Sequence, residues 1–351
     1  MTVSGPLEAR FGDIQVPAEV QRGEFTEIPV VDLANMASES LADRKQVAAE
    51  IYKVATTVGF FYIKNHGLPQ ELFDDAEDWS RRFFELPHEI KMKSFCGGRN
   101  NEFIGYLPQA EDLPVSAASH LHVAAASKVE AYALGYENDA DERKKAGDPP
   151  PSDPFHLHGP NAWPSHEELP GFQEWQLYYY GELLKFSHRL TKLIALALNL
   201  DDSAFDHLFN SPGSICRLMH YLPRKVSAGE HASIKPHTDI DFFTILLQGK
   251  VPGLQVRNRK GDWIAAPLIP NALVVNIGDT LHYLTNGIFK STPHRAINLT
   301  GEQRRSIPFF MNVDHTATIG PMPEFVTKQR PAIREPFVYG EWLRNLMAGS
   351  N

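Results

Sequence analysis

The chain has 351 residues and a formal net charge of −9, and its 42% hydrophobic and 22% charged content is typical of a soluble globular protein of one large domain or two. The negative charge and the absence of a Lys/Arg-rich tract argue against a nucleic-acid partner, and no apolar run is long enough to span a membrane. With only two cysteines, Cys96 and Cys216, a disulfide framework is excluded and a reducing, cytoplasmic location is expected.

The N-terminal part of the chain combines short strands with amphipathic helices. Residues 1–25 are expected to form an irregular arm, and residues 97–170, rich in Gly, Pro and Asp, a lid-like loop. Apolar spacings of two and 3.6 residues predict the regular elements. In chain order these are a strand at 28–33, a helix at 40–58, a strand at 60–63, and helices at 72–84 and 172–200.

From Pro212-Gly213 onward the pattern changes to short strands separated by turns. The expected strands lie at 216–221, 244–247, 254–257, 263–265, 272–277 and 307–313, and a helix at 340–347 closes the chain. Many short strands joined by Gly, Pro and Asn turns are typical of a sandwich or a jelly-roll barrel. We therefore predict an α+β fold, in which a mostly helical region at 26–210 packs on a jelly-roll core with flanking helices at 211–351.

The most informative pattern is His237-Thr238-Asp239 followed at a distance by His294. On an extended strand, His237 and Asp239 point to the same face because they are two residues apart. The turns at 278–279 and 286–287 give the chain enough length to cross a sheet and return beside this pair. The chain has 15 histidines, so a lone His-x-Asp would mean little. Together, however, two imidazoles and one carboxylate are the ligands of a facial triad, which holds a metal from one side and leaves other coordination positions open.

A second feature follows ten residues after His294. Arg304 and Ser306 lie two residues apart, so on a strand they share one face. A fork-shaped guanidinium beside a hydroxyl is suited to bind the carboxylate of a small acid.

Short motifs in both halves of the chain support these assignments. In the N-terminal half they lie at 28–32, 58–67, 83–87 and 159–164. In the C-terminal half they lie at 236–239, 253–256, 276–279, 286–287, 291–295 and 304–310. Together they resemble the iron(II)- and 2-oxoglutarate-dependent dioxygenases, in their isopenicillin N synthase-like branch. The resemblance covers nearly everything from residue 28 to residue 347.

This resemblance implies a double-stranded β-helix that binds Fe(II) through His237, Asp239 and His294. It further implies that O2 and 2-oxoglutarate are cosubstrates, with ascorbate as an accessory reductant. Decarboxylation of 2-oxoglutarate to succinate and CO2 would drive hydroxylation, desaturation or ring closure of a small metabolite. Related halogenating enzymes replace the carboxylate ligand with a small residue, so the presence of Asp239 argues against halogenation.

For the cosubstrate, the resemblance implies that Arg304 and Ser306 bind the far carboxylate of 2-oxoglutarate, with Tyr221 assisting from a neighbouring strand. The sequence departs from the branch before the triad. The branch commonly has Asn-x-Tyr there, and this chain has Met219-His220-Tyr221.

Strand alternation adds an expectation about the substrate. If Tyr221 faces the site, Met219 and Arg217 share its face. An arginine inside an apolar barrel costs free energy unless it meets an anion. Arg217 is therefore expected either to bind an acidic group of the substrate or to form an internal salt bridge with a protein carboxylate. The other residues expected to contact the substrate are Met219, Phe310, Phe103 and Tyr106.

Three other functions are compatible with these motifs. One is an oxidase that takes all its electrons from its substrate and uses no 2-oxoglutarate. Another is an enzyme that fragments 2-oxoglutarate to ethylene, and the third is a non-catalytic barrel that senses a ligand. Members of the branch act on flavonoids, hormones, alkaloids, peptides and nucleobases, so the substrate is not predicted, and the chain is expected to be a monomer or a weak homo-oligomer.

Overall fold

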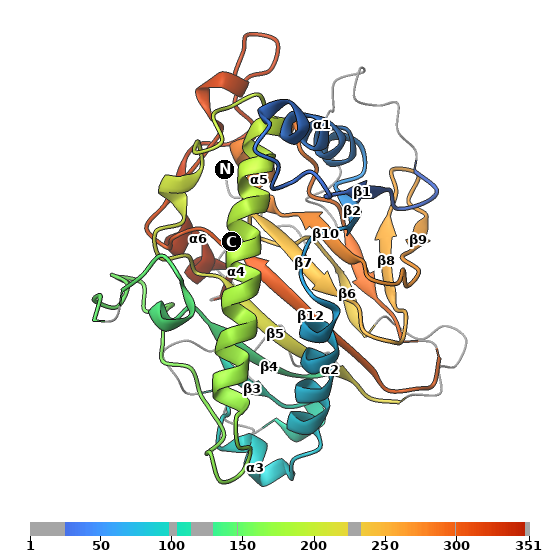
Figure 1. Ribbon diagram of the computed structural model, residues 1–351, viewed down its shortest axis with the longest axis vertical. Coiled ribbons are helices and arrows are strands. Elements are labelled where there is room, and N and C mark those ends of the chain that lie inside the picture. The colour runs from blue at the N-terminus through green and yellow to red at the C-terminus, as the bar shows by residue number, and fades with distance from the viewer. Residues whose placement is uncertain are drawn as a thin grey trace.

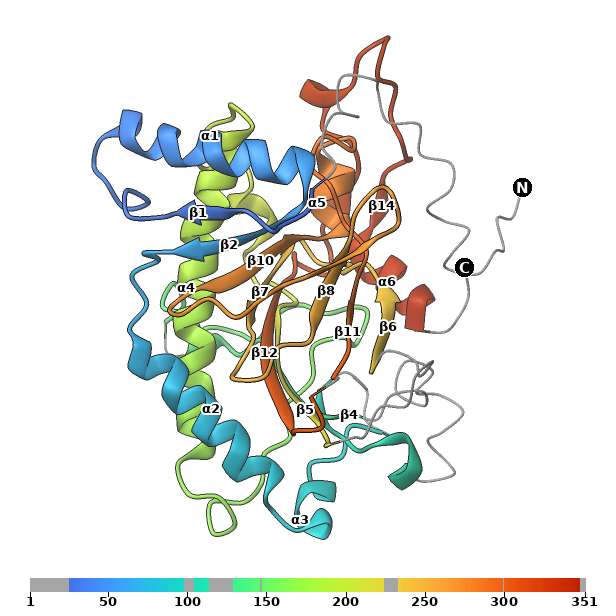
Figure 2. The same cartoon turned by 90° about the vertical axis from the view of Figure 1, so that its right-hand side faces the viewer.

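A computed structural model describes residues 25–97, 104–113, 129–145, 147–223, 233–298 and 300–347. Three layers lie side by side in Figure 2. Helices form the first layer, a large sheet the second and a smaller sheet the third. No helix within the described ranges is both long and apolar enough to cross a membrane.

The larger sheet runs in the order β1-β2-β10-β7-β12-β5-β4-β3 among the described residues. Its strands are β1 (Val30–Asp32), β2 (Phe60–Lys64), β3 (Gly105–Leu107), β4 (Val129–Gly135), β5 (Ile215–Tyr221), β7 (Phe243–Leu247), β10 (Leu273–Ile277) and β12 (Arg304–Met311). Neighbours are antiparallel except β1 and β2, which are parallel. The sheet thus joins strands from both halves of the sequence.

The smaller sheet has the order β6-β11-β8-β9. Its strands are β6 (Ile234–His237), β8 (Leu254–Arg257), β9 (Trp263–Ala265) and β11 (His294–Ala296), and a separate short pair is formed by β13 (Thr318–Ile319) and β14 (Phe337–Val338). Between the two sheets, Phe60 and Val274 of the larger one pack with Val256 of the smaller one. This pair of facing antiparallel sheets confirms the predicted jelly-roll core.

Helices cover the other face of the larger sheet, where α4 crosses the strands obliquely (Figure 1). The helices are α1 (Leu41–Thr57), α2 (Gln70–Phe84), α3 (His88–Met92), α4 (Phe172–Ala197), α5 (Asp279–Leu284) and α6 (Tyr339–Met347), with one-turn helices η3 (Ala110–Asp112), η4 (Asn138–Ala140), η5 (Asp206–Leu208) and η6 (Pro323–Phe325). The four predicted helices are confirmed as α1, α2, α4 and α6. The two shortest α-helices, α3 and α5, were not predicted, because five or six residues show too little periodicity.

Gly59 links α1 to β2 at a point of close approach. Its φ is +73°, and a Cβ at this position would lie 2.1 Å from the carbonyl oxygen of Lys290. Only glycine fits here, because it adopts a positive φ without strain and has no Cβ to clash with that oxygen. The position ties the N-terminal helix to the segment that leads into β11.

The prediction of a lid-like loop at 97–170 is wrong for part of that segment. Residues 129–135 form β4, which is buried along its whole length between β3 and β5. Glycine and alanine in this strand weakened its apolar pattern, although burial on both faces favours a strand there.

The predicted arm lies outside the described residues except for Phe25. The domain boundary at 210/211 stays a prediction, although the larger sheet is continuous across it.

A buried charged cluster attaches α3 to the helix-facing side of β4 and β5. Glu130 accepts hydrogen bonds from Lys91 Nζ at 2.7 Å and from Tyr106 Oη at 2.6 Å, and His220 Nδ1 lies 2.8 Å from its other oxygen. Burial raises the pKa of Glu130, but the hydrogen bonds from His220, Lys91 and Tyr106 outweigh burial and lower it below 4.5. The carboxylate form of Glu130 therefore stabilises the fold.

Replacing Glu130 with glutamine is expected to lower the free energy of unfolding at pH 7 by about 2 kcal/mol, since hydrogen bonds to a buried charge are lost. A lowered folded-state pKa contributes stability above the unfolded value near 4.5 and loses it as the pH falls further. The difference between wild type and Glu130→Gln should therefore shrink below pH 4.5 in urea titrations. A constant difference, or an equal loss in the exposed control Glu71→Gln, would contradict this account.

Candidate metal and cosubstrate site

The three residues of the predicted triad meet at the smaller sheet. His237 ends β6 and His294 begins β11, and these two residues are direct partners in the ladder. Asp239 follows His237 by two residues, and its Oδ1 lies 3.5 Å from His237 Nε2 and 3.7 Å from His294 Nε2. The sequence prediction that the distant histidine returns beside the His-x-Asp pair is confirmed.

This donor set fits a metal ion. One donor atom from each residue lies within 4.8 Å of the other two. Donors that share an ion at about 2.1 Å are roughly 3–4 Å apart, which matches the two distances to Asp239. His237 Nδ1 donates to the carbonyl oxygen of Lys235 at 2.8 Å, so Nε2 of the neutral ring is left with the lone pair that binds a metal.

The electrostatics of the triad favour ligation. Burial raises the pKa of Asp239, but the neighbouring His294 and His237 outweigh burial and hold it well below its usual range. Burial and the charge of His237 lower the pKa of His294 to about 4. For His237, burial lowers the pKa, and the hydrogen bond and charge of Asp239 outweigh burial and raise it. At neutral pH the site therefore offers a carboxylate and a neutral imidazole, the forms that bind metals.

Arg304, at the start of β12, is a buried cation. Only 1% of the residue is exposed, and its guanidinium lies 4.5 Å from the centre of the Tyr221 ring, its cross-strand partner on β5. Its guanidinium donates hydrogen bonds to the carbonyl oxygen of Val251 at 3.2 Å and to Ser306 Oγ at 3.3 Å. No carboxylate in the described part of the chain forms an ion pair with it. A buried guanidinium without an anionic partner is suited to bind a carboxylate that a ligand supplies.

Arg217 on β5 is a second cation on the same strand pair. It is half-buried, and its guanidinium lies 5.8 Å from the centre of the Phe310 ring on β12. Burial lowers its pKa, which is a measure of how poorly the charge is solvated. Within the ranges that the structure describes, no acidic side chain forms a salt bridge with Arg217. The internal salt bridge, one of the two expectations for this residue, is therefore not found there.

The outcome differs for each of the three other residues predicted to contact the substrate. Met219 is the cross-strand partner of Ser306 and packs with Tyr221 in the apolar cluster that reaches β11. Tyr106 was predicted to contact the substrate, and that prediction is wrong: its hydroxyl belongs to the Glu130 cluster on the opposite face of the sheet. Phe103 lies outside the described residues.

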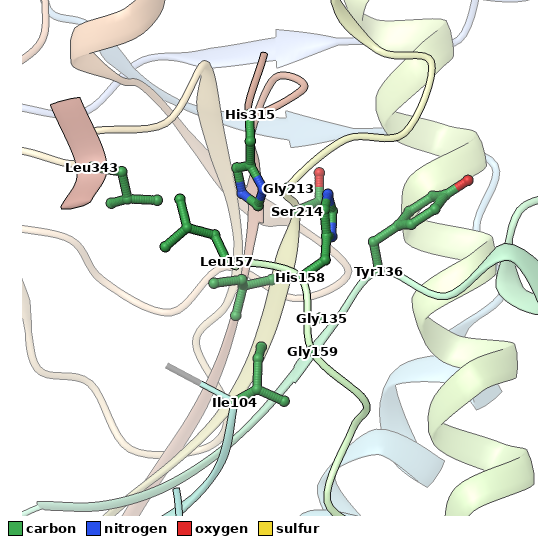
Figure 3. Close-up of a pocket in the computed structure, with 11 residues that line it drawn as sticks. Ile104, Gly135, Tyr136, Leu157, His158, Gly159, Gly213, Ser214, His315 and Leu343 are labelled. Atoms are coloured by element: carbon green, nitrogen blue, oxygen red, sulfur yellow. The ribbon is translucent and has the colours of Figure 1, made fainter. Parts of the chain in front are cut away.

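A small pocket opens at the Ile215 end of β5 (Figure 3). Ile215 shares its strand face with Arg217, two residues away. Apolar side chains from distant segments line the pocket with it, namely Ile104, Leu157 and Leu343. In Figure 3 the ring of His315 points toward Gly213 and Ser214. Polar residues line the pocket as well, namely Tyr136, His158, Ser214 and His315, and Arg217 is not among the lining residues.

Two residues that contact Asp239 were missed by the sequence prediction. Thr244 and Asn276 both donate hydrogen bonds to its carboxylate. Asn276 stands in one of the motifs that carried the resemblance, but its motif gave it no role. An isolated polar residue in an apolar strand, as both are, was the available signal.

Two family patterns match this chain. Residues 28–166 match the family described as non-haem dioxygenase in morphine synthesis N-terminal, and residues 213–313 match the 2OG-Fe(II) oxygenase superfamily. A 2-oxoglutarate-Fe(II) type oxidoreductase of Metarhizium majus is 36% identical over 81% of this chain and 77% of its own length. Kihadalactone A synthase of Citrus sinensis is 32% identical over 87% of this chain and 88% of its own.

Solved structures agree with the sequence relatives. A Neurospora crassa protein in complex with alpha-KG and thymine superimposes with a TM-score of 0.77 at 26% identity, covering 92% of this chain and 97% of that one. This chain belongs to the 2OG-Fe(II) oxygenase superfamily. It is an Fe(II)- and 2-oxoglutarate-dependent dioxygenase that acts on a small molecule, as the sequence predicted.

Proposed function

We propose that His237, Asp239 and His294 hold the Fe(II). The support is the convergence of their donor atoms, which come from two paired strands and the residues just after one of them. When bound, the iron and 2-oxoglutarate would supply, together with O2, the oxidative decarboxylation to succinate and CO2 that is coupled to oxidation of the substrate. The role of the protein is to fix the three ligands on one side of the ion.

The cosubstrate site that we propose is the buried end of β12. Arg304 and Ser306 bind the far carboxylate of 2-oxoglutarate, and the Tyr221 ring supports the guanidinium. The single observation that carries this assignment is the absence of an ion-pairing carboxylate around Arg304 in the described ranges. A bidentate carboxylate would supply the missing charge and use the fork geometry of the guanidinium.

For the substrate, we propose a small molecule that carries an acidic group. Arg217 binds that group, and Phe310 and Met219 form apolar walls next to it. Hydroxylation, desaturation and ring closure are all compatible with this arrangement, because each begins from a substrate held beside the metal ligands.

The proposed function is tested by O2 consumption and succinate formation with Fe(II) and 2-oxoglutarate. Slow turnover without a prime substrate is expected for the wild type, and it should be lost in His237→Ala, which lacks one ligand. His207→Ala, which changes an exposed histidine of η5, is the matched control and should keep the wild-type rate. If His237→Ala forms succinate as fast as this control, the proposed metal site is wrong.

The cytoplasmic location and the monomeric or weakly oligomeric state stay predictions. Cys96 and Cys216 are both buried and form no disulfide bond with each other, as expected for a chain that does not depend on disulfides. Burial raises the pKa of the Cys216 thiol, so this cysteine is unreactive rather than nucleophilic.

A further inference from the structure

The two oxygens of the Asp239 carboxylate have different surroundings. Oδ1 faces the two imidazoles, 3.5 Å from His237 Nε2 and 3.7 Å from His294 Nε2. Oδ2 points the other way and accepts hydrogen bonds from Thr244 Oγ1 at 2.6 Å and from Asn276 Nδ2 at 2.8 Å. One oxygen is thus directed at the metal position, and the other is engaged by protein donors.

The two donors come from the rigid centre of the larger sheet. Thr244 on β7 and Asn276 on β10 are direct cross-strand partners, so their side chains stand next to each other on one face. Both residues are 3% exposed. Their strands are flanked by β12 and β2, which leaves neither strand at an edge. The pair therefore has little freedom to follow a rotation of the carboxylate.

We propose that Thr244 and Asn276 are positioning residues that restrict Asp239 to binding the metal through Oδ1 alone. This inference rests on the proposed metal site. A facial triad is useful because the opposite side of the ion stays open for cosubstrates. An aspartate that turned to bind through both oxygens would occupy part of that open side.

The two donors are not equivalent. The Thr244 hydroxyl also lies 2.7 Å from Asp241 Oδ2, and its single proton can serve only one carboxylate at a time. The Asn276 amide donates to Asp239 and has no such competing carboxylate among the described residues. The larger effect on Asp239 is therefore expected from the loss of Asn276.

The test is calorimetric titration of Mn(II) into metal-free protein in the presence of 2-oxoglutarate, together with crystal structures of the Mn(II) complexes. In Asn276→Leu the Mn(II) affinity should fall about 10- to 100-fold, the range for residues that orient a metal ligand. Thr244→Val should lose less, and Thr244→Ser, which keeps the hydroxyl, should restore wild-type affinity. In the crystal structures, Asp239 should bind through Oδ1 in the wild type and through both oxygens in Asn276→Leu.

A purely structural role would give a different result. The control Thr191→Val removes a buried hydroxyl of α4 that bonds to the Ser187 carbonyl oxygen, and it should leave Mn(II) affinity unchanged. Unchanged affinity in both Asn276→Leu and Thr244→Val, or bidentate Asp239 in the wild type, overturns the inference while the metal site stands. If wild-type protein binds no Mn(II), or His237→Ala binds it equally well, the proposed function fails as well.

Discussion

Replacing Arg304 with methionine is expected to abolish useful binding of 2-oxoglutarate while leaving the fold intact. Truncating one partner of a buried charge pair costs about 2–5 kcal/mol, or roughly 30- to several-thousandfold in affinity. The free protein should lose little stability, because its described part gives Arg304 no anionic partner that would be left unpaired. Titration of 2-oxoglutarate into the Mn(II)-loaded variant measures the first effect, and urea unfolding measures the second.

The neighbouring Arg305 provides the matched control. It alternates with Arg304 on β12, so its side chain lies on the other face of the sheet, where the charges of Glu85 and Glu77 act on it. Arg305→Met should therefore bind 2-oxoglutarate with wild-type affinity. Arg304→Lys keeps the charge without the planar fork and should fall between wild type and Arg304→Met. Wild-type affinity in Arg304→Met would refute the cosubstrate assignment.

Replacing Arg217 with leucine is expected to remove the preference for acidic substrates. The probes are small carboxylic acids and their primary amides, compared by how much each accelerates succinate formation. In the wild type, acids that fit should accelerate turnover and the matched amides should not. In Arg217→Leu, KM for such an acid should rise about 30-fold or more, because a half-buried carboxylate loses its cation.

The affinity for 2-oxoglutarate distinguishes this effect from general damage to the site. It should be unchanged in Arg217→Leu, since Arg304, the residue proposed to bind the cosubstrate, lies at the other end of the strand pair. Arg217→Lys should recover part of the discrimination between acid and amide. Equal acceleration by acid and amide in the wild type, or an unchanged KM in Arg217→Leu, would show that Arg217 does not recognise the substrate.

The convergence of the three candidate metal ligands could be predicted from the sequence because it rests on a local His-x-Asp pattern and on recognisable turns. His237 and Asp239 are two residues apart on an extended segment, and the turns before His294 fix the return of the chain. The long helices were predictable for the same reason, since 26 residues of regular apolar spacing in α4 leave little ambiguity.

Contacts across the sheet were not predictable in this way. Tyr106 was assigned to the substrate because it lies in an irregular segment, whereas its partner Glu130 is buried on the far face of β4. The contact between Asn276 and Asp239 depends on which strands become neighbours, and local periodicity does not contain that information. The sequence also left open whether Arg217 forms an internal salt bridge or binds the substrate, because the answer depends on which side chains lie near it in the fold.

The pairing of β2 with β10 has a consequence for synthesis on the ribosome. Residues 60–63 of β2 pair with residues 273–276, about 210 positions later in the chain. At a translation rate of about 5–20 residues per second, β2 waits roughly 10–40 seconds for this partner. During that time a nearly continuous apolar strand, Phe60–Lys64, lacks the neighbour that covers one of its edges. Until the second half has emerged, that edge of β2 is open to pairing with another chain unless a chaperone or the helices of the chain itself cover it.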